Sequence, residues 1–350
     1  MEKLLVDLIG DSFYLVVALI ICCLPLVFLL PYALVAILAE LKISAWIQDR
    51  LGPMRTGPWG ILQPIAEVVK LLQKEDTTPT NASKLLYNIA PFVIFTGSYA
   101  AFAAIPFSSE YVAANINIGL FYLLAVSAIA VVGILMGGWA SNNKYSLYGA
   151  IRSVAQIISY EIPGAIALLA IVTLAGTMNL QEINSQQSGG FWNWYIFGGP
   201  GSITKIIIVP FMMALALIYF LATLAETNRT PFDLPEAESE LVSGYHTEYS
   251  GIKFAMFFFA EYANMFVVSA VLVSLFLGGW NSPFGDFLQG PIYGFFWFVS
   301  KSVALIVFQI WVRWTIPRLR VDHLMYVCWK VLLPISVVCF FAVGLYRMIF

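Results

Sequence analysis

The sequence predicts an all-α polytopic membrane protein, with eight transmembrane helices plus an amphipathic interfacial helix in the first cytoplasmic loop. Hydrophobic residues make up 60% of the 350 residues, charged residues make up only 11%, and the mean hydropathy is +0.84. This apolar content exceeds what a soluble domain needs for its core. The apolar residues also form continuous blocks of the ~20 residues that a helix needs to cross a bilayer. A transmembrane β-barrel would instead show short alternating segments.

Eight apolar ranges predict the spans of a single membrane domain, residues 1-350. These ranges are 13-39, 88-108, 117-139, 150-177, 203-225, 253-279, 291-316 and 325-349. The first follows the acidic stretch "MEKLLVDLIGDS" and is longer than the apolar core of a cleavable signal peptide, so we expect it to remain as a span. The four cysteines lie within spans and lack the spacing of disulfide, zinc or iron–sulfur sites. We therefore expect neither a metal nor a bound cofactor in this chain.

Positive charge predicts which side of the membrane each loop faces. The first, third, fifth and seventh loops (40-87, 140-149, 226-252 and 317-324) contain ten Lys and Arg residues, and the loops between them (109-116, 178-202 and 280-290) contain none. In membrane proteins, the excess of Lys and Arg lies in cytoplasmic loops. We therefore expect the odd-numbered loops in the cytoplasm and both termini on the non-cytoplasmic side of the cell inner (plasma) membrane.

The first loop contains a shaped turn followed by a helical pattern. The stretch "RLGPMRTGPWGILQP" is dense in glycine and proline, which predicts a turn. In "GILQPIAEVVKLLQKED" the apolar residues recur at helical spacing, with Gln63, Glu67, Lys70, Gln73 and Lys74 on the other face. Such a helix can lie in the plane of the membrane interface, or it can dock on a soluble partner. Both interpretations stay open on the sequence alone.

Acidic residues are concentrated in an otherwise apolar chain. The fifth-loop stretch "AETNRTPFDLPEAESELVSGYHTEYSG" contains six carboxylates, Glu161 and Glu261 lie inside spans, and Glu40 closes the first span. An acid at the bilayer centre costs ~2.5–3.5 kcal/mol on insertion scales, so a functional role is the default expectation. A pair between Glu161 and Arg152 is a weak structural alternative, because nine positions separate them on one helix.

Two interpretations of the fifth loop compete. Asp233, ahead of Pro235 and Glu236, has the pattern of a helix N-cap with acids in the first turn, as on a solvated helix. That pattern does not account for Glu240 on the same helical face as Glu236, where like charges repel. Crowded carboxylates near low dielectric raise one another's pKa, so such a row can carry protons. The sequence therefore favours a proton path toward Glu261 and Glu161.

Four motifs resemble one known family. "ETNRTPFDLPEAESELVSGYHTEYSGIKFAMFFFAEY", "RLGPMRTGPWGILQPIAEVVKLLQKED", "SNNKYSLYGAIRSVAQIISYEIP" and "VRWTIPRLRVDHLM" occur in the order and over the length typical of the quinone-site membrane subunit of respiratory complex I, the NADH:quinone oxidoreductase. The resemblance implies a quinone-access tunnel framed by the first span, the sixth span and the loop-one helix. It also implies that quinone, as substrate, is reduced in adjoining soluble subunits. Flavin and iron–sulfur clusters belong to those partners, and small membrane subunits link the chain to antiporter-like subunits.

The same resemblance implies roles for individual residues. A proton path or coupling role falls on Glu161, Glu226, Asp233, Glu236, Glu238, Glu240, Glu261, Arg229 and Arg152. The quinone tunnel and its rim involve Glu40, Gln48, Arg50, Gly52, Pro53, Glu67, Arg313, Arg318 and Arg320. The chain departs from the family pattern at Leu41, Met54, Glu67 and His323, where Arg, Asn, Asp and Gln are usual.

Alternative classes fit the sequence less well. An ion-coupled secondary transporter would use Glu161 and Glu261 as coupling acids, but such folds show repeated halves, and no motif here repeats. The equivalent subunit of a ferredoxin-fed or hydrogenase-linked relative stays open, since the electron donor leaves no mark on this chain.

Overall fold

The chain folds into a bundle of long apolar helices. The computed structural model describes residues 2–201, 203–234, 238–285 and 287–349, and within these ranges it contains helices and loops but no strand. Eight helical segments are long and apolar enough to cross a membrane: Pro25–Ile47, Lys84–Ala103, Gly119–Ala140, Lys144–Ala175, Val209–Glu226, Gly251–Phe276, Pro291–Thr315 and Val321–Ile349. Each apolar range of the sequence overlaps one of them, which confirms an all-α, multi-pass membrane protein.

The eight segments comprise the long helices of the bundle. They are α1 (Glu2–Ile47), α3 (Lys84–Ala100), α4 (Gly119–Ala140), α5 (Lys144–Ala175), α7 (Val209–Glu226), α9 (Gly251–Phe276), α10 (Pro291–Thr315) and α12 (Leu333–Ile349). The shorter helices are α2 (Gln63–Gln73), α6 (Leu180–Gln186), α8 (Glu238–Leu241) and α11 (Val321–Tyr326), and a π-helix, Val327–Leu332, joins α11 to α12. Helix α1 continues past the first apolar range as far as Ile47.

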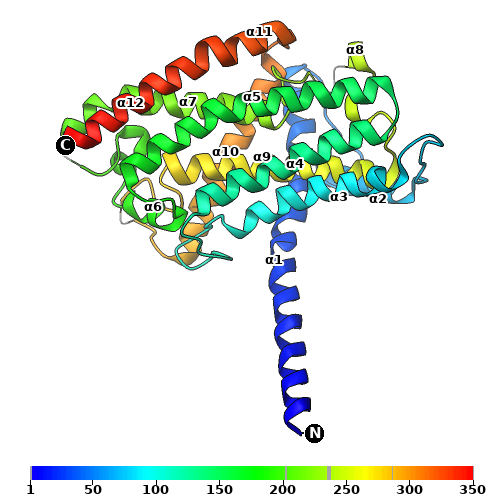
Figure 1. Ribbon diagram of the computed structural model, residues 1–350, viewed down its shortest axis with the longest axis horizontal. Coiled ribbons are helices and arrows are strands. Elements are labelled where there is room, and N and C mark those ends of the chain that lie inside the picture. The colour runs from blue at the N-terminus through cyan, green and yellow to red at the C-terminus, as the bar shows by residue number, and fades with distance from the viewer. Residues whose placement is uncertain (1, 202, 235–237, 286, 350) are drawn as a thin grey trace.

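Helix α9 lies at the centre of the bundle, and α1 lies at its edge. In the most apolar window of α9, 72% of the residues are buried, whereas the corresponding value in α1 is 22%. Figure 1 shows α3, α4, α5 and α12 running along the bundle, while α1 runs across them and projects away toward the N-terminus. Helix α9 packs against α1, α3, α7 and α10. Polar side chains on α9 therefore face protein on several sides.

A proline fixes the contact between α5 and the C-terminal helix. Pro163 lies inside α5 and has no amide hydrogen, so the carbonyl of Ser159 lacks its usual helical donor. The thiol of Cys328, in the π-helix, donates to that carbonyl at 3.0 Å. The Tyr160 hydroxyl donates to the Leu324 carbonyl at 3.1 Å. These bonds anchor the C-terminal helix on the turn of α5 that also carries the half-buried Glu161.

The end of α7 turns the chain back into the protein. Asn228 adopts a left-handed conformation (φ 49°) just after the helix. The Arg229 amide donates to the Leu224 carbonyl at 3.0 Å, and the Asn228 amide donates to the Ala225 carbonyl at 3.3 Å. This pair of bonds is the Schellman arrangement, in which asparagine is the usual substitute for glycine. It reverses the chain immediately after α7, and the Arg229 side chain is buried as a result.

Candidate functional site

Arg229 is the centre of a buried ion cluster. Its side chain is 1% exposed. The Arg229 Nη1 atom donates to both carboxylate oxygens of Glu40, at 2.8 and 2.7 Å, and its Nε atom lies 3.0 Å from Glu261 Oε1. Glu40 comes from α1 and Glu261 from α9. One guanidinium therefore joins the peripheral helix to the central one.

Two further side chains complete this cluster. Arg313, from α10, forms an ion pair with Glu40 Oε1, and the Tyr262 hydroxyl donates to Glu40 Oε2 at 2.7 Å. The Arg229 guanidinium lies over the Tyr262 ring, 4.9 Å from its centroid. Two carboxylates thus face two guanidiniums, so the ionised cluster is neutral overall. Buried charges are tolerated when they are paired and hydrogen-bonded in this way.

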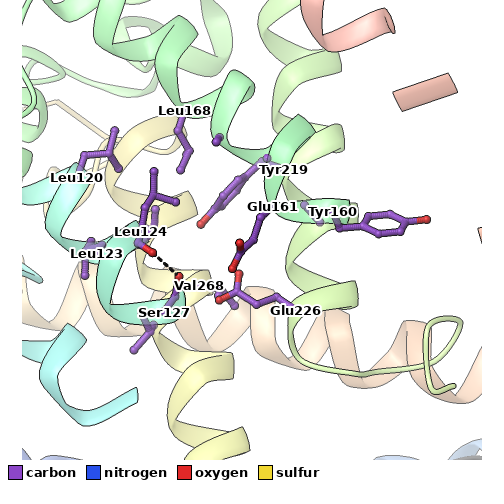
Figure 2. A pocket seen from close by; sticks show the side chains of 15 residues that line it. Leu120, Leu123, Leu124, Ser127, Tyr160, Glu161, Leu168, Tyr219, Glu226 and Val268 are labelled. Atoms are coloured by element: carbon purple, nitrogen blue, oxygen red, sulfur yellow. Dashed lines mark hydrogen bonds between the residues drawn. The ribbon is translucent and has the colours of Figure 1, made fainter. Parts of the chain in front are cut away.

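A second group of acids faces a cavity between α4, α5, α7 and α9. Figure 2 shows the carboxyl groups of Glu161 and Glu226 pointing toward each other, with the Tyr219 side chain beside them. The cavity has a volume of about 40 Å³ and is otherwise lined mainly by leucine and valine. A water molecule needs roughly 10–15 Å³ and two or more polar partners. The cavity meets both conditions, so water can connect the two carboxyl groups.

A second cavity, also about 40 Å³, extends this group toward the ion cluster. Glu226 and Ser127 line both cavities, and Glu261 and Asn264 line the second. The Asn264 amide donates to Glu226 Oε1 at 3.4 Å. Since Asn264 follows Glu261 by one helical turn, it lies between the two acids. Glu161, Glu226, Glu261 and Glu40 therefore form a chain, called the buried acid chain below, whose intervals are filled by Asn264, Arg229 and room for water.

The acids of the fifth loop are divided between the surface and this chain. Glu240 is half-exposed and pairs with Arg152 at 2.6 Å, so the structure does not bring it into the buried acid chain. The hydrogen bond from Arg152 lowers the pKa of Glu240, with a smaller contribution from Arg318 and Arg320 nearby. These two arginines are exposed at the same rim of the protein.

Asp233, Glu236 and Glu238 differ in what the structure describes. Asp233 lies close enough to Glu261 for the two charges to act on each other. Glu236 falls outside the described residues, and so does the side chain of Glu238, although its backbone begins α8. In the described part of the chain, no three His, Cys, Asp or Glu side chains come together as a metal site would require.

The loop-one residues assigned to the tunnel lie at the end of α1. Gln48 and Arg50 are exposed there. The Lys42 ammonium donates to the Pro53 carbonyl at 2.6 Å, which folds the loop back on the helix. A Cβ atom on Gly52 would lie 3.1 Å from Lys42 Cδ and 3.4 Å from Ala45 Cβ, so a larger residue here would require the Lys42 side chain to shift. The glycine–proline turn predicted from the sequence thus has a physical basis.

Helix α2 and the two residues before it present apolar side chains that the described part of the chain leaves exposed. On its polar side, the Gln63 amide donates to Glu67 at 3.2 Å. The apolar residues are each at least 40% exposed: Ile61, Leu62, Ile65, Val68, Val69 and Leu72. An exposed face of this kind fits a lipid, a quinone or another protein, so both interpretations of the loop-one helix remain open.

The site residues that were not predicted from the sequence are neutral. Tyr262, Asn264 and Ser127 carry no formal charge and therefore do not stand out in an apolar span. The signal for Asn264 was available, because it lies three positions after Glu261 on the same face of a helix. Tyr262, directly after Glu261, gives no such signal, because adjacent residues of a helix do not share a face. Ser127 gives no such signal, since it reaches the site from α4 through tertiary packing.

The fold and the site together define a multi-pass helical membrane protein with a chain of ionisable side chains buried among its helices. The sequence comparisons add the family. The model of the NADH dehydrogenase family matches residues 19–344, so the chain belongs to that family. This confirms the resemblance carried by the four motifs.

The relatives are proteins named as the H-type member of NADH-quinone oxidoreductase. The protein of that name from Chlorobium luteolum is 56% identical over 92% of this chain and 87% of its own length. That of Bacteroides thetaiotaomicron is 47% identical over 87% of this chain and 84% of its own length. The one from Cytophaga hutchinsonii, whose name carries the number 2, is 43% identical over 89% of this chain and 94% of its own length.

Proposed function

We propose that this chain is the membrane subunit of a proton-pumping NADH:quinone oxidoreductase. It forms the membrane part of a quinone-access tunnel, and it couples quinone reduction to proton movement through the buried acid chain. The proposal rests on family membership and, above all, on one observation. Four carboxylates from α1, α5, α7 and α9 lie in sequence inside the protein, joined by Arg229, Asn264 and cavities that can hold water.

The tunnel would open beside the ion cluster. Its mouth would be framed by α1, α2 and α9, and the exposed apolar face of α2 suits a long isoprenoid tail. Arg313 pairs with Glu40 in the last turn of α10, and these ends of α1 and α10 would face the cytoplasm. Arg318, Arg320 and the Arg152–Glu240 pair would form the rim that faces the soluble subunits.

The cluster gives a physical route for coupling. Reduction of a quinone adds negative charge and takes up protons in a space poorly screened by water. Because Arg229 contacts Glu40 and Glu261 at once, a change of charge near Glu40 alters the field on Glu261. Glu261 and Glu226 are linked through Asn264, and Glu226 faces Glu161 across the first cavity. Interacting acids titrate as a group, so a proton change at one end can shift protons at the other.

The remaining assignments follow from this function. Both termini would lie on the non-cytoplasmic side of the inner membrane. Flavin, iron–sulfur clusters and the site of electron transfer to quinone would belong to soluble partners, and small membrane subunits would continue the path toward antiporter-like subunits. NADH as the ultimate donor is taken from the names of the relatives.

Neutral isosteres test the proposed path. Glu161→Gln and Glu226→Gln keep size and hydrogen bonding but cannot titrate. In assembled complex, reconstituted into vesicles, we expect both variants to lose most quinone reductase activity and proton pumping. Reduction of an artificial acceptor by the upstream subunits should stay at the level of the unchanged protein.

A matched control uses Glu182→Gln, an exposed acid of the α6 segment that accepts a hydrogen bond from Thr177. It should pump normally. Normal pumping by both buried variants would reject the path. Glu240→Gln, tested alongside, would decide whether the surface pair with Arg152 belongs to the path.

A further inference from the structure

The residues that follow α2 are bound to the start of α9. None of the side chains that make these contacts belongs to the buried acid chain. Lys253, in the first turn of α9, is 8% exposed, although it is a lysine. Its ammonium lies 2.8 Å from Asp76 Oδ2 and donates to Asn88 Oδ1 at 2.7 Å. Buried ammonium groups require such partners. Asp76 follows α2, so this ion pair connects the loop-one helix to α9.

Hydroxyl groups make a second set of bonds across the same junction. The Ser250 hydroxyl donates to the Glu75 carbonyl at 2.9 Å and lies 3.1 Å from the Thr77 hydroxyl. Ser250 immediately precedes α9, and Glu75 and Thr77 flank Asp76. Four polar side chains therefore hold a short segment of loop one against the beginning of the central helix.

Gly251 shows how close the two backbones come. It has a left-handed conformation (φ 60°), and a Cβ atom there would lie 3.0 Å from the Lys74 carbonyl oxygen and 3.6 Å from that of Leu71. Those carbonyls belong to the last turn of α2 and the residue after it. The negative end of the α2 dipole thus faces the positive end of α9, an arrangement that favours contact.

The junction rests on a rigid base. Tyr87, on α3, is fully buried and stacks on Tyr249 with ring centroids 4.2 Å apart. The Tyr87 hydroxyl donates to the Glu248 carbonyl at 2.7 Å, and the Asn143 amide donates to the Glu248 carboxylate at 2.6 Å. The residues just before α9 are therefore held by α3 and by the start of α5.

We propose that Asp76, Lys253 and Ser250 bind α2 to α9 so that the two helices move as one body, with Lys253 as a positioning residue for the buried acid chain. Glu261 lies on α9 about two turns beyond Lys253. A displacement of α2 by a quinone in the tunnel mouth is then passed along α9 to Glu261, and through Glu261 to the ion cluster. The inference rests on the proposed function, because it assigns α2 to the tunnel mouth.

Breaking the ion pair is the first test. In assembled complex, Lys253→Met should raise the KM for quinone about fivefold. A change of this size is typical of substitutions that weaken the coupling between two sites. It should also lower the number of protons pumped per quinone reduced. Reduction of an artificial acceptor should not change. Lys253→Arg keeps the positive charge and should leave the KM and the pumping ratio as they are in the unchanged protein. Lys70→Met, at an exposed lysine of α2, is the matched control and should also leave both values unchanged.

A cross-link is the second test, and it works even if Lys253→Met fails to assemble. Cysteines at Thr77 and Ser250 replace hydroxyls that lie 3.1 Å apart, so their oxidation should form a disulfide. If α2 and α9 move together, the oxidised double variant keeps full turnover. Added to Lys253→Met, the disulfide should restore the low KM, and a reductant should abolish the rescue.

The possible results distinguish a failure of this inference from a failure of the proposed proton path. Loss of turnover on oxidation, reversed by reductant and absent from the single-cysteine variants, would overturn the inference, since the helices would then have to separate. An unchanged KM and pumping ratio in assembled Lys253→Met would overturn it as well. A tolerated cross-link together with normal pumping by both Glu161→Gln and Glu226→Gln would reject the proton path, while the attachment of α2 to α9 would stand.

Discussion

Replacing Glu40 by glutamine should destabilise the protein far more than any surface acid. Its side chain is 10% exposed and accepts from Arg229, Arg313 and Tyr262. The substitution removes the carboxylate that pairs with Arg313, and it leaves Arg229, which is 1% exposed, with Glu261 as its remaining ion-pair partner among the described residues. Removing one partner of a buried ion pair costs about 3–5 kcal/mol, because the other charge stays buried without compensation.

The surface pair of Arg152 and Glu240 supplies the matched comparison. Its side chains are 34% and 50% exposed, so solvent screens the charges. Exposed pairs contribute about 0–1 kcal/mol. We therefore expect Glu240→Gln to change the free energy of unfolding by less than about 1 kcal/mol. The two glutamine substitutions are chemically identical, and only their surroundings differ.

The assay is denaturant unfolding of the purified full chain in detergent micelles, with the amount of assembled complex in membranes as a second measure. A double variant that also carries Arg313→Gln removes one positive charge and restores neutrality. It should be more stable than Glu40→Gln alone. If Glu40→Gln and Glu240→Gln cost the same within about 1 kcal/mol, or if the second substitution brings no recovery, the account of a charge-balanced buried cluster is wrong.

Two further predictions concern pH and topology. Burial of His246 among Tyr245, Phe254 and Phe257 lowers its pKa from 6.5 to about 3, so below pH 6.5 the unfolded chain binds a proton that the folded chain does not. The free energy of unfolding should therefore be about 2 kcal/mol lower at pH 5 than above pH 6.5. His246→Phe should remove this pH dependence from unfolding curves measured from pH 5 to 8; a dependence that persists in the variant would contradict the lowered pKa of His246. Single cysteines at Lys144 and Gln289, both exposed, should react with an impermeant thiol reagent from opposite sides of the membrane when the native cysteines are replaced by serine; labelling from one side would refute the eight-span topology.

The span pattern was predictable because it depends on local composition. A helix in a bilayer satisfies its backbone internally, so a run of apolar residues is enough to specify it. The Asn228 cap at the end of α7 and the glycine–proline turn of loop one likewise follow from nearby residues. The positive-charge bias in alternate loops is also a local property, and it yields a topology that labelling can check.

The ion cluster was not predictable in this way. The resemblance assigns Glu40 and Arg313 to the tunnel, and Arg229 and Glu261 to the proton path. In the structure all four are in contact, although 189 residues separate Glu40 from Arg229 and 273 separate it from Arg313. No spacing along the chain encodes a contact among α1, α9, α10 and the loop that follows α7. Residues that the resemblance assigns to the tunnel and residues that it assigns to the proton path therefore meet at Arg229.

The sequence by itself determined that the chain is a helical membrane protein, that acids lie within its spans, and which family its motifs resemble. These properties depend on residue type and on order along the chain. Only the tertiary structure decided which acids lie together. It sets Glu240 at the surface, brings Glu226 and Glu261 to one cavity with Asn264, and pairs Lys253 with Asp76. The physical reason is that a buried charge is stabilised by an opposite charge close to it in space. Tertiary packing alone decides which helices and loops bring such charges together.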